Sequence, residues 1–276
     1  MRAGKVTGWV LITLLTLQAA CGGALKGGES RSLLPHASAG FNLFSPEQDI
    51  QLGEASAEEI MRQVVVVRDE RTEEYVQRLG ERVAARAPGY KFPYKFVVVA
   101  SPEVNAFALP GGYVFVNEGA IEAARTEGEL AGVLAHEIAH VSLRHGTTQA
   151  SRAYLARTAL GVVNAFAGGG GLWGVAAAAC GAGANRFFLR SNREAELQAD
   201  AEGARLLAEA GFDPRDMADF FERLDEREGE REDATASDHP DPASRVRAID
   251  QVANALEQPP ARTRDSEEFR RIKARL

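Results

Sequence analysis

The chain has little cysteine, few aromatic residues and no excess of positive charge. It contains only two cysteines in 276 residues, Cys21 and Cys180. If Cys21 carries lipid, as its position suggests, Cys180 has no partner within the chain. The fold therefore cannot depend on an internal disulfide, even though we expect the protein in an oxidising compartment.

The low content of aromatic residues and of positive charge restricts the fold class and the kinds of partner that we expect. Aromatic residues make up only 7% of the chain, whereas alanine and glycine are abundant, and we therefore expect helices to dominate. The formal charge of −7 argues against nucleic acid as the main partner, because phosphate binding needs a basic surface. The hydrophobic content of 45% is enough for one sizeable core or two small ones, and no repeat of fixed period is present.

The N-terminus has the layout of a secretory signal peptide. A short basic region precedes the apolar stretch WVLITLLTLQAA, which is too short to span a membrane comfortably as a mature helix. Small residues lead into Cys21 as in a bacterial lipobox, although Leu17 stands one position early and Gln18 takes its place. We expect 1–20 to be a signal peptide and 21–40 to be a lipidated cysteine with a flexible tether. An ordinary cleaved signal is the alternative, and either one places the protein outside the cytoplasm.

The remaining sequence predicts an α+β fold that is predominantly helical. Ser45 is a good N-cap and Pro46 fits the first turn of a helix, so order should begin near this point. The hydrophobic period then changes from helical to that of strands, and helices return afterwards. We expect helices at 45–63, 72–87, 126–146 and 191–211, a strand at 95–100, and two strands within 105–117.

The helix between Thr126 and Gly146 carries three of the chain's five histidines. Thr126 begins a capping-box pattern, and Gly146 stands where a helix stop is expected. His136 and His140 are four residues apart, which places their side chains about 6 Å from each other on one side of a helix. They could share one metal ion, and Glu137 between them could act as a general base through water. The alternative is that two core histidines happen to have this spacing.

A catalytic zinc needs a third protein ligand. His145 is the nearest candidate, but an extended H-E-x-x-H-x-x-G-x-x-H site would need glycine and histidine where the chain has Leu143 and Gly146. We therefore expect His145 to help cap the last turn of its helix, where the helix dipole favours it.

The downstream helix at 191–211 offers a better third ligand. Glu196 and Asp200 stand four apart, so a helix that crosses the first one could point Glu196 at the metal. Asp200 could then accept a hydrogen bond from the far nitrogen of a ligand histidine. The alternative for both is an exposed acidic face, to which we assign the neighbouring Glu194.

The chain resembles the minigluzincin metallopeptidases of the CAAX prenyl-protease/HtpX group, within the soluble periplasmic branch of BepA- and LoiP-like proteins. Four segments carry the resemblance: NAFALPGGYVFVNEGAI, LAHEIAHVSLRHG, NREAELQAD and DHPDPASRV. It implies a zincin-like peptidase domain at 41–258, with a small antiparallel sheet packed on the H-E-x-x-H helix and a charged C-terminal tail at 259–276. It also implies one Zn²⁺ held by His136, His140 and Glu196, Glu137 as catalytic base and acid, and Asp200 orienting a ligand.

The resemblance suggests roles for three further parts of the chain. In zincins a substrate lies as an extra strand along a sheet edge, and Asn105–Ala108 resembles that edge, although it could simply be one arm of a hairpin. His239, in a loop before a helix, could stabilise an oxyanion or occupy the open zinc position and keep the enzyme latent, and the alternative is an ordinary surface histidine. Arg245 could bind a substrate carbonyl or pair with a nearby acid.

These features together predict a zinc metalloendopeptidase that cleaves misfolded or unassembled cell-envelope proteins. We expect it to face the bacterial periplasm on a lipid anchor, with the outer membrane favoured because Gly22 stands where aspartate commonly marks inner-membrane retention. The Gly/Ala-rich segment 159–185 could be a lid or a membrane-dipping hairpin. The alternative function is a zinc-containing chaperone or assembly factor that cuts little.

Overall fold

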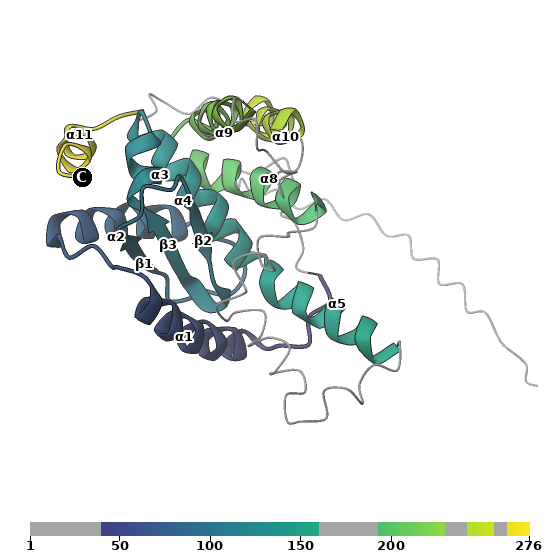
Figure 1. Cartoon of the computed structure of the whole chain (residues 1–276). Helices are drawn as coiled ribbons and strands as arrows, with labels where there is room; N and C mark the ends of the chain where they lie inside the picture. The colour runs from purple at the N-terminus through teal and green to yellow at the C-terminus, as the bar shows by residue number, and fades with distance from the viewer. Residues whose placement is uncertain (1–39, 160–192, 230–241, 257–263) are drawn as a thin grey trace, which may run out of the picture. The chain divides into compact units, whose positions relative to one another are not determined.

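A computed structural model describes residues 40–159, 193–229, 242–256 and 264–276 (Figure 1). Several predictions fall outside these residues and stay predictions: the signal peptide, lipidation of Cys21, nearly all of the 159–185 segment, and His239. Within the described part of the chain, no helix combines the length and apolar character that crossing a bilayer would require.

Two N-terminal helices begin at capped positions. In α1 (Pro46–Gln63), the Ser45 hydroxyl accepts from the Gln48 N–H while the Gln48 side chain accepts from the Ser45 N–H, which completes a capping box. In α2 (Glu70–Ala84), the side chain of Asp69 accepts from the N–H of Thr72. The predicted start of the first helix is confirmed, and the second begins two residues earlier than predicted.

The sheet has three strands in the order β1-β3-β2. β1 (Lys95–Val99) pairs with β3 (Tyr113–Asn117) in parallel, and β2 (Ala106–Ala108) pairs with β3 antiparallel. The sheet is therefore mixed, whereas the resemblance implies an antiparallel one. The reason is topological: after β1 the chain passes to the far edge to form β2, and the turn η1 (Pro110–Gly112) then returns it through the middle as β3. Gly111 and Gly112 supply positive φ angles of 81° and 118° for this turn.

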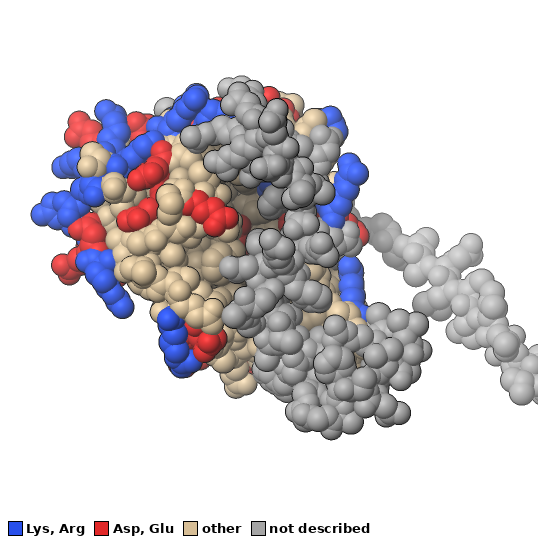
Figure 2. Space-filling view, viewed as in Figure 1, with Lys and Arg blue, Asp and Glu red and all other residues tan. Residues whose placement is uncertain are grey.

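The short helix α3 (Glu118–Ala123) follows the sheet and leads into the central helix α4 (Glu127–Ser142) (Figure 1). α4 packs against α2, the sheet, α8 (Arg193–Glu209) and α9 (Pro214–Gly229), and α10 (Pro242–Ala255) packs on α8 and α9. Because it has neighbours on all sides, α4 is buried over nearly its whole length. The side chains of His136 and His140 therefore lie largely inside the protein. On the surface, acidic and basic side chains are interspersed, as Figure 2 shows for one face.

The end of α4 differs from the prediction. The sequence predicts a helix stop at Gly146, but the residue with left-handed backbone is Arg144, at φ 56°, and a new helix, α5 (His145–Ala159), begins immediately after it. A non-glycine residue pays about 1 kcal/mol or more for this conformation. Two contacts from far upstream offset it: Arg144 bonds both carboxylate oxygens of Asp49, at 2.7 and 3.1 Å, and the carbonyl of Phe44 at 2.5 Å.

We expect Arg144→Ala to lower the free energy of unfolding by about 3 kcal/mol, because it leaves a buried carboxylate without its partner. Asp49 is 1% exposed, and burial already raises its pKa in spite of the bond from Arg144. The measurement is chemical denaturation. The matched control is Arg62→Ala, whose partner Glu59 lies on an exposed helix surface, and it should cost less than about 0.5 kcal/mol. Equal small losses in both variants would contradict this reading of the junction.

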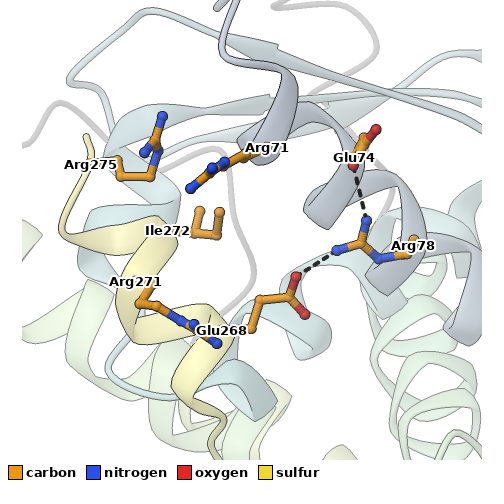
Figure 3. Close-up of a pocket in the computed structure, with 7 residues that line it drawn as sticks. All are labelled: Arg71, Glu74, Arg78, Glu268, Arg271, Ile272 and Arg275. Carbon is orange, nitrogen blue, oxygen red and sulfur yellow. Dashed lines mark hydrogen bonds and ion pairs between the residues drawn. The ribbon is translucent and has the colours of Figure 1, made fainter.

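The C-terminal segment is not a free tail. The sequence suggests a charged tail at 259–276, but α11 (Glu267–Lys273) packs on α2 and buries Phe269 and Ile272 in the main core. Charged side chains surround Phe269 and Ile272. In the pocket between α2 and α11, Arg78 forms an ion pair with Glu268 at 2.6 Å (Figure 3). Two apolar residues one turn apart are enough to dock an otherwise charged helix.

Candidate metal centre

The three side chains expected to bind metal converge where α4 and α8 cross. The Nε2 atoms of His136 and His140 are 3.0 Å apart. Oε2 of Glu196 lies 3.4 Å from Nε2 of His136, and its Oε1 lies 3.4 Å from Nε2 of His140. One ligand atom from each residue lies within 4.8 Å of the others. The structure therefore brings together, from two separate helices, the set that the sequence predicts.

The close crossing of the two helices depends on a glycine. A Cβ on Gly203 in α8 would lie 3.1 Å from the backbone nitrogen of His136. A side chain there would require the backbones of α8 and α4 to move apart by a few tenths of an ångström. The absence of a side chain at Gly203 thus lets a carboxylate reach two imidazoles across the interface.

The chemistry of these donors fits a divalent cation. Two imidazoles and one carboxylate form the donor set of catalytic zinc sites that keep an open position. Oε2 of Glu196 is buried and has no hydrogen bond within the described part of the chain, so this oxygen has a lone pair directed into the cluster without a proton donor. Burial would raise the pKa of Glu196, but the neighbouring His136 and His140 hold it well below its usual range, and the carboxylate stays ionised.

Asp200 and Arg245 hold the ring of His136. Oδ1 of Asp200, which is fully buried, lies 3.0 Å from Nδ1 of His136. Arg245 donates to both oxygens of Asp200, at 2.9 and 2.7 Å, and its guanidinium lies over the ring of Phe221. Of the two alternatives for Arg245, this is pairing with a nearby acid. The two hydrogen bonds from the Arg245 guanidinium compensate the buried negative charge of Asp200. The same carboxylate can also accept a hydrogen bond from His136 and so orient its ring.

Burial has opposite effects on the pKa values of neighbouring groups in this cluster. Burial lowers the pKa of His136, but the hydrogen bond to Asp200 and the neighbouring carboxylate of Glu196 outweigh it and raise the value to about 9. Burial also raises the pKa of Glu137 to about 7, assisted by the charge of Glu196 and opposed by His136 and Arg245. A carboxyl group with a pKa near neutrality is matched to accepting and returning a proton.

Glu137 lies beside β2, the edge strand of the described sheet. α4 packs against β2 here, and the backbone N–H of Ala108 is near enough to the Glu137 carboxyl group to oppose the rise in its pKa. The backbone N–H of Leu109 donates to the carbonyl of Tyr113, and that of Asn117 donates to the carbonyl of Asn105. In this segment it is therefore the odd-numbered residues whose backbone groups form hydrogen bonds with β3. In an antiparallel ladder the alternate residues point the other way, so the N–H and C=O groups of Ala106 and Ala108 face outward. Phe107 stands opposite Phe115 of β3 on the same side of the sheet, and their rings stack with centroids 4.9 Å apart.

This geometry favours the edge-strand reading of Asn105–Ala108. β2 is at the end of the strand order, with β3 on one side and no further strand beside it in the described sheet. Backbone groups that point outward at an edge can add an extended peptide as another strand. Such a peptide would pass next to Glu137.

The structure corrects the prediction for His145. It does not cap the end of α4, where the backbone N–H groups of Leu143 and Arg144 donate to the carbonyls of Ala139 and Val141. Its buried ring instead faces His140, with the two Nδ1 atoms 2.9 Å apart, and its Nε2 lies 3.2 Å from Oε1 of Gln198 in α8. A continuous helix would have placed His145 about 140° around the axis from His140, and only the break at Arg144 turns it back. Glu194 is exposed, as predicted.

Comparison with known proteins gives matches over most of the described chain. Residues 70–253 match the family described as Peptidase family M48. A putative beta-barrel assembly-enhancing protease of Vibrio cholerae serotype O1 is 33% identical over 240 residues, which cover 83% of this chain and 49% of that protein. Metalloprotease LoiP of Escherichia coli K12 is 30% identical over 181 residues, covering 64% and 69%.

A eukaryotic relative gives a similar match. Mitochondrial metalloendopeptidase OMA1 of Schizosaccharomyces pombe is 34% identical over 189 residues, 64% of this chain and 52% of that protein. The chain spans about half the length of the beta-barrel assembly-enhancing proteases that it matches.

Proposed function

Because the chain belongs to peptidase family M48, we propose that it is a zinc-dependent endopeptidase whose centre is formed by His136, His140 and Glu196. The observation that carries this proposal is the convergence of two imidazoles and one distant carboxylate beside β2, the edge strand of the described sheet. The buried, unbonded oxygen of Glu196 supports the cation, and the donor set supports zinc.

The residues around the centre divide the work of peptide hydrolysis. A bound zinc ion would supply a Lewis acid that polarises the scissile carbonyl and lowers the pKa of water to about 7. Glu137, with its pKa raised to about 7 by burial, takes the proton from the attacking water and delivers it to the leaving amine. Ala106 holds the substrate backbone through its outward N–H and C=O groups, and Ala108 through its outward C=O group, because the N–H of Ala108 is directed at Glu137. Asp200 and Arg245 keep the His136 ring oriented.

We assign the substrate as unfolded or misassembled polypeptide of the cell envelope. Binding along a strand edge uses backbone groups that every polypeptide has, and it requires an extended segment, which unfolded chains supply. The relatives named beta-barrel assembly-enhancing protease support an envelope substrate. The expected signal peptide and lipidation at Cys21 would place the enzyme in the periplasm, anchored at the outer membrane.

One assay distinguishes a peptidase from the alternative, a zinc-containing chaperone. Removing metal with 1,10-phenanthroline should abolish cleavage of a reduced, unfolded polypeptide, and added zinc should restore it, because metal and water activation are inseparable at this site. The measurement is the appearance of peptide products by mass spectrometry, with bound metal quantified in the same samples. A protein that binds zinc and suppresses aggregation of the polypeptide without cutting it would overturn the peptidase proposal in favour of the chaperone.

A further inference from the structure

Four side chains form a continuous line from the metal centre to the surface of α8. The Nε2 atom of His140 faces the other ligands, 3.0 Å from His136 and 3.4 Å from Glu196. Its other nitrogen, Nδ1, lies 2.9 Å from Nδ1 of His145. Nε2 of His145 lies 3.2 Å from Oε1 of Gln198, and the amide nitrogen of Gln198 donates to Glu194 at 3.3 Å.

The metal end of this line determines which group donates and which accepts each hydrogen bond. A histidine that binds metal through Nε2 carries its proton on Nδ1, so His140 donates from that atom. His145 must then accept at Nδ1, which leaves its proton on Nε2. That N–H donates to the carbonyl oxygen of Gln198, whose amide group is in turn oriented by the carboxylate of Glu194. Each group in the line therefore donates a hydrogen bond to the next one, from His140 through His145 and Gln198 to Glu194.

We propose that His145 is a positioning residue that, together with Gln198, fixes the tautomer and orientation of His140 for metal binding. This inference rests on the proposed function, because it assigns a role toward the same metal. Second partners of ligand histidines hold the ring and raise its basicity. His136 has such a partner in Asp200, and His145 supplies the equivalent for His140.

The choice of a neutral partner has an electrostatic reason. Asp200 carries a buried negative charge that Arg245 compensates through two bonds. A second carboxylate at position 145 would be buried with only the exposed Arg152 near it and without the paired hydrogen bonds that Arg245 gives Asp200, and a poorly compensated buried charge is costly. A neutral imidazole accepts the same hydrogen bond without adding charge to the site.

His145 does not reach the metal as a fourth ligand. It contacts the Nδ1 side of the His140 ring, and the ligand atoms of the cluster meet at the opposite nitrogen. The cluster of metal-binding groups in the described chain accordingly contains His136, His140 and Glu196 without His145. Its effect on the metal passes through His140.

The test compares zinc affinity in matched variants, measured by competition with a chromophoric chelator. His145→Leu removes the acceptor and should weaken zinc binding about 10- to 100-fold. His145→Asn keeps an oxygen acceptor on the same branch of the side chain as Nδ1 and should restore affinity to near the wild-type value. Gln198→Leu, at a partly exposed position that does not threaten folding, should weaken binding in the same direction by less. Thr148→Val, one turn along α5 and bonded to Asn42, is the control and should change nothing.

Two further measurements separate positioning from loss of structure. The absorption bands of the cobalt(II)-substituted protein report the ligand geometry, and they should change in His145→Leu but match the wild type in Thr148→Val. The thermal midpoint of the metal-free variants reports folding. Wild-type zinc affinity in His145→Leu, or equal weakening in His145→Leu and His145→Asn, would overturn the inference while the peptidase proposal stands. A wild-type protein that binds no zinc would overturn both.

Discussion

Replacing Glu137 with glutamine should remove peptide hydrolysis almost completely while the zinc stays bound. Glutamine has nearly the same shape but cannot accept a proton from water. A positioned general base contributes about 100- to 10,000-fold to such reactions, so kcat should fall by at least about 100-fold. Zinc content should be unchanged, because the side chain of Glu137 is not among the three converging ligand atoms.

The measurements for Glu137→Gln are the initial rate of cleavage of an unfolded polypeptide and the metal content of the same preparation. Glu122→Gln makes the same chemical change on α3 at an exposed position and should retain full activity. A Glu137→Gln variant with wild-type kcat would remove this residue from the mechanism. A variant that has lost its zinc would instead show that Glu137 supports the metal site.

The second large effect is expected from Glu196→Ala, which should abolish activity by releasing the metal. It removes one of three protein ligands, and we expect zinc affinity to fall by more than the roughly 10- to 100-fold typical of outer-sphere partners. In the metal-free state, the cost of burying the ionised carboxylate opposes its attraction to His136 and His140. We therefore expect the free energy of unfolding of the metal-free variant to differ from that of the metal-free wild type by no more than about 1 kcal/mol.

Zinc affinity and the free energy of unfolding of the metal-free protein check this second prediction together. Glu209→Ala is the matched control, because Glu209 is exposed at the end of the same helix, and it should alter neither quantity. Retention of wild-type zinc affinity in Glu196→Ala would exclude the carboxylate as a ligand. A large loss of stability without metal would show that Glu196 has a structural role instead.

The sequence was sufficient for the features that depend on neighbouring residues. Ser45 and Thr126 cap their helices by hydrogen bonds that span three residues, and the histidines at 136 and 140 share a side of α4 because of helix geometry alone. Glu196 was also within reach, although it lies 60 residues away. The chemistry demanded a third ligand, and E-x-x-x-D on a helical segment offered one.

Tertiary structure alone decided the features that depend on contacts between distant segments. The break at Arg144 is stabilised by Asp49, 95 residues upstream, and no local signal predicts it, because left-handed arginine is unfavourable by itself. That break turns His145 toward His140, and the packing of α8 then places Gln198 against it. The strand order of the sheet and the attachment of α11 to α2 depend in the same way on long-range packing. Local periodicity identified which residues could bind a metal, and only the packing of distant segments determined what holds those residues in place.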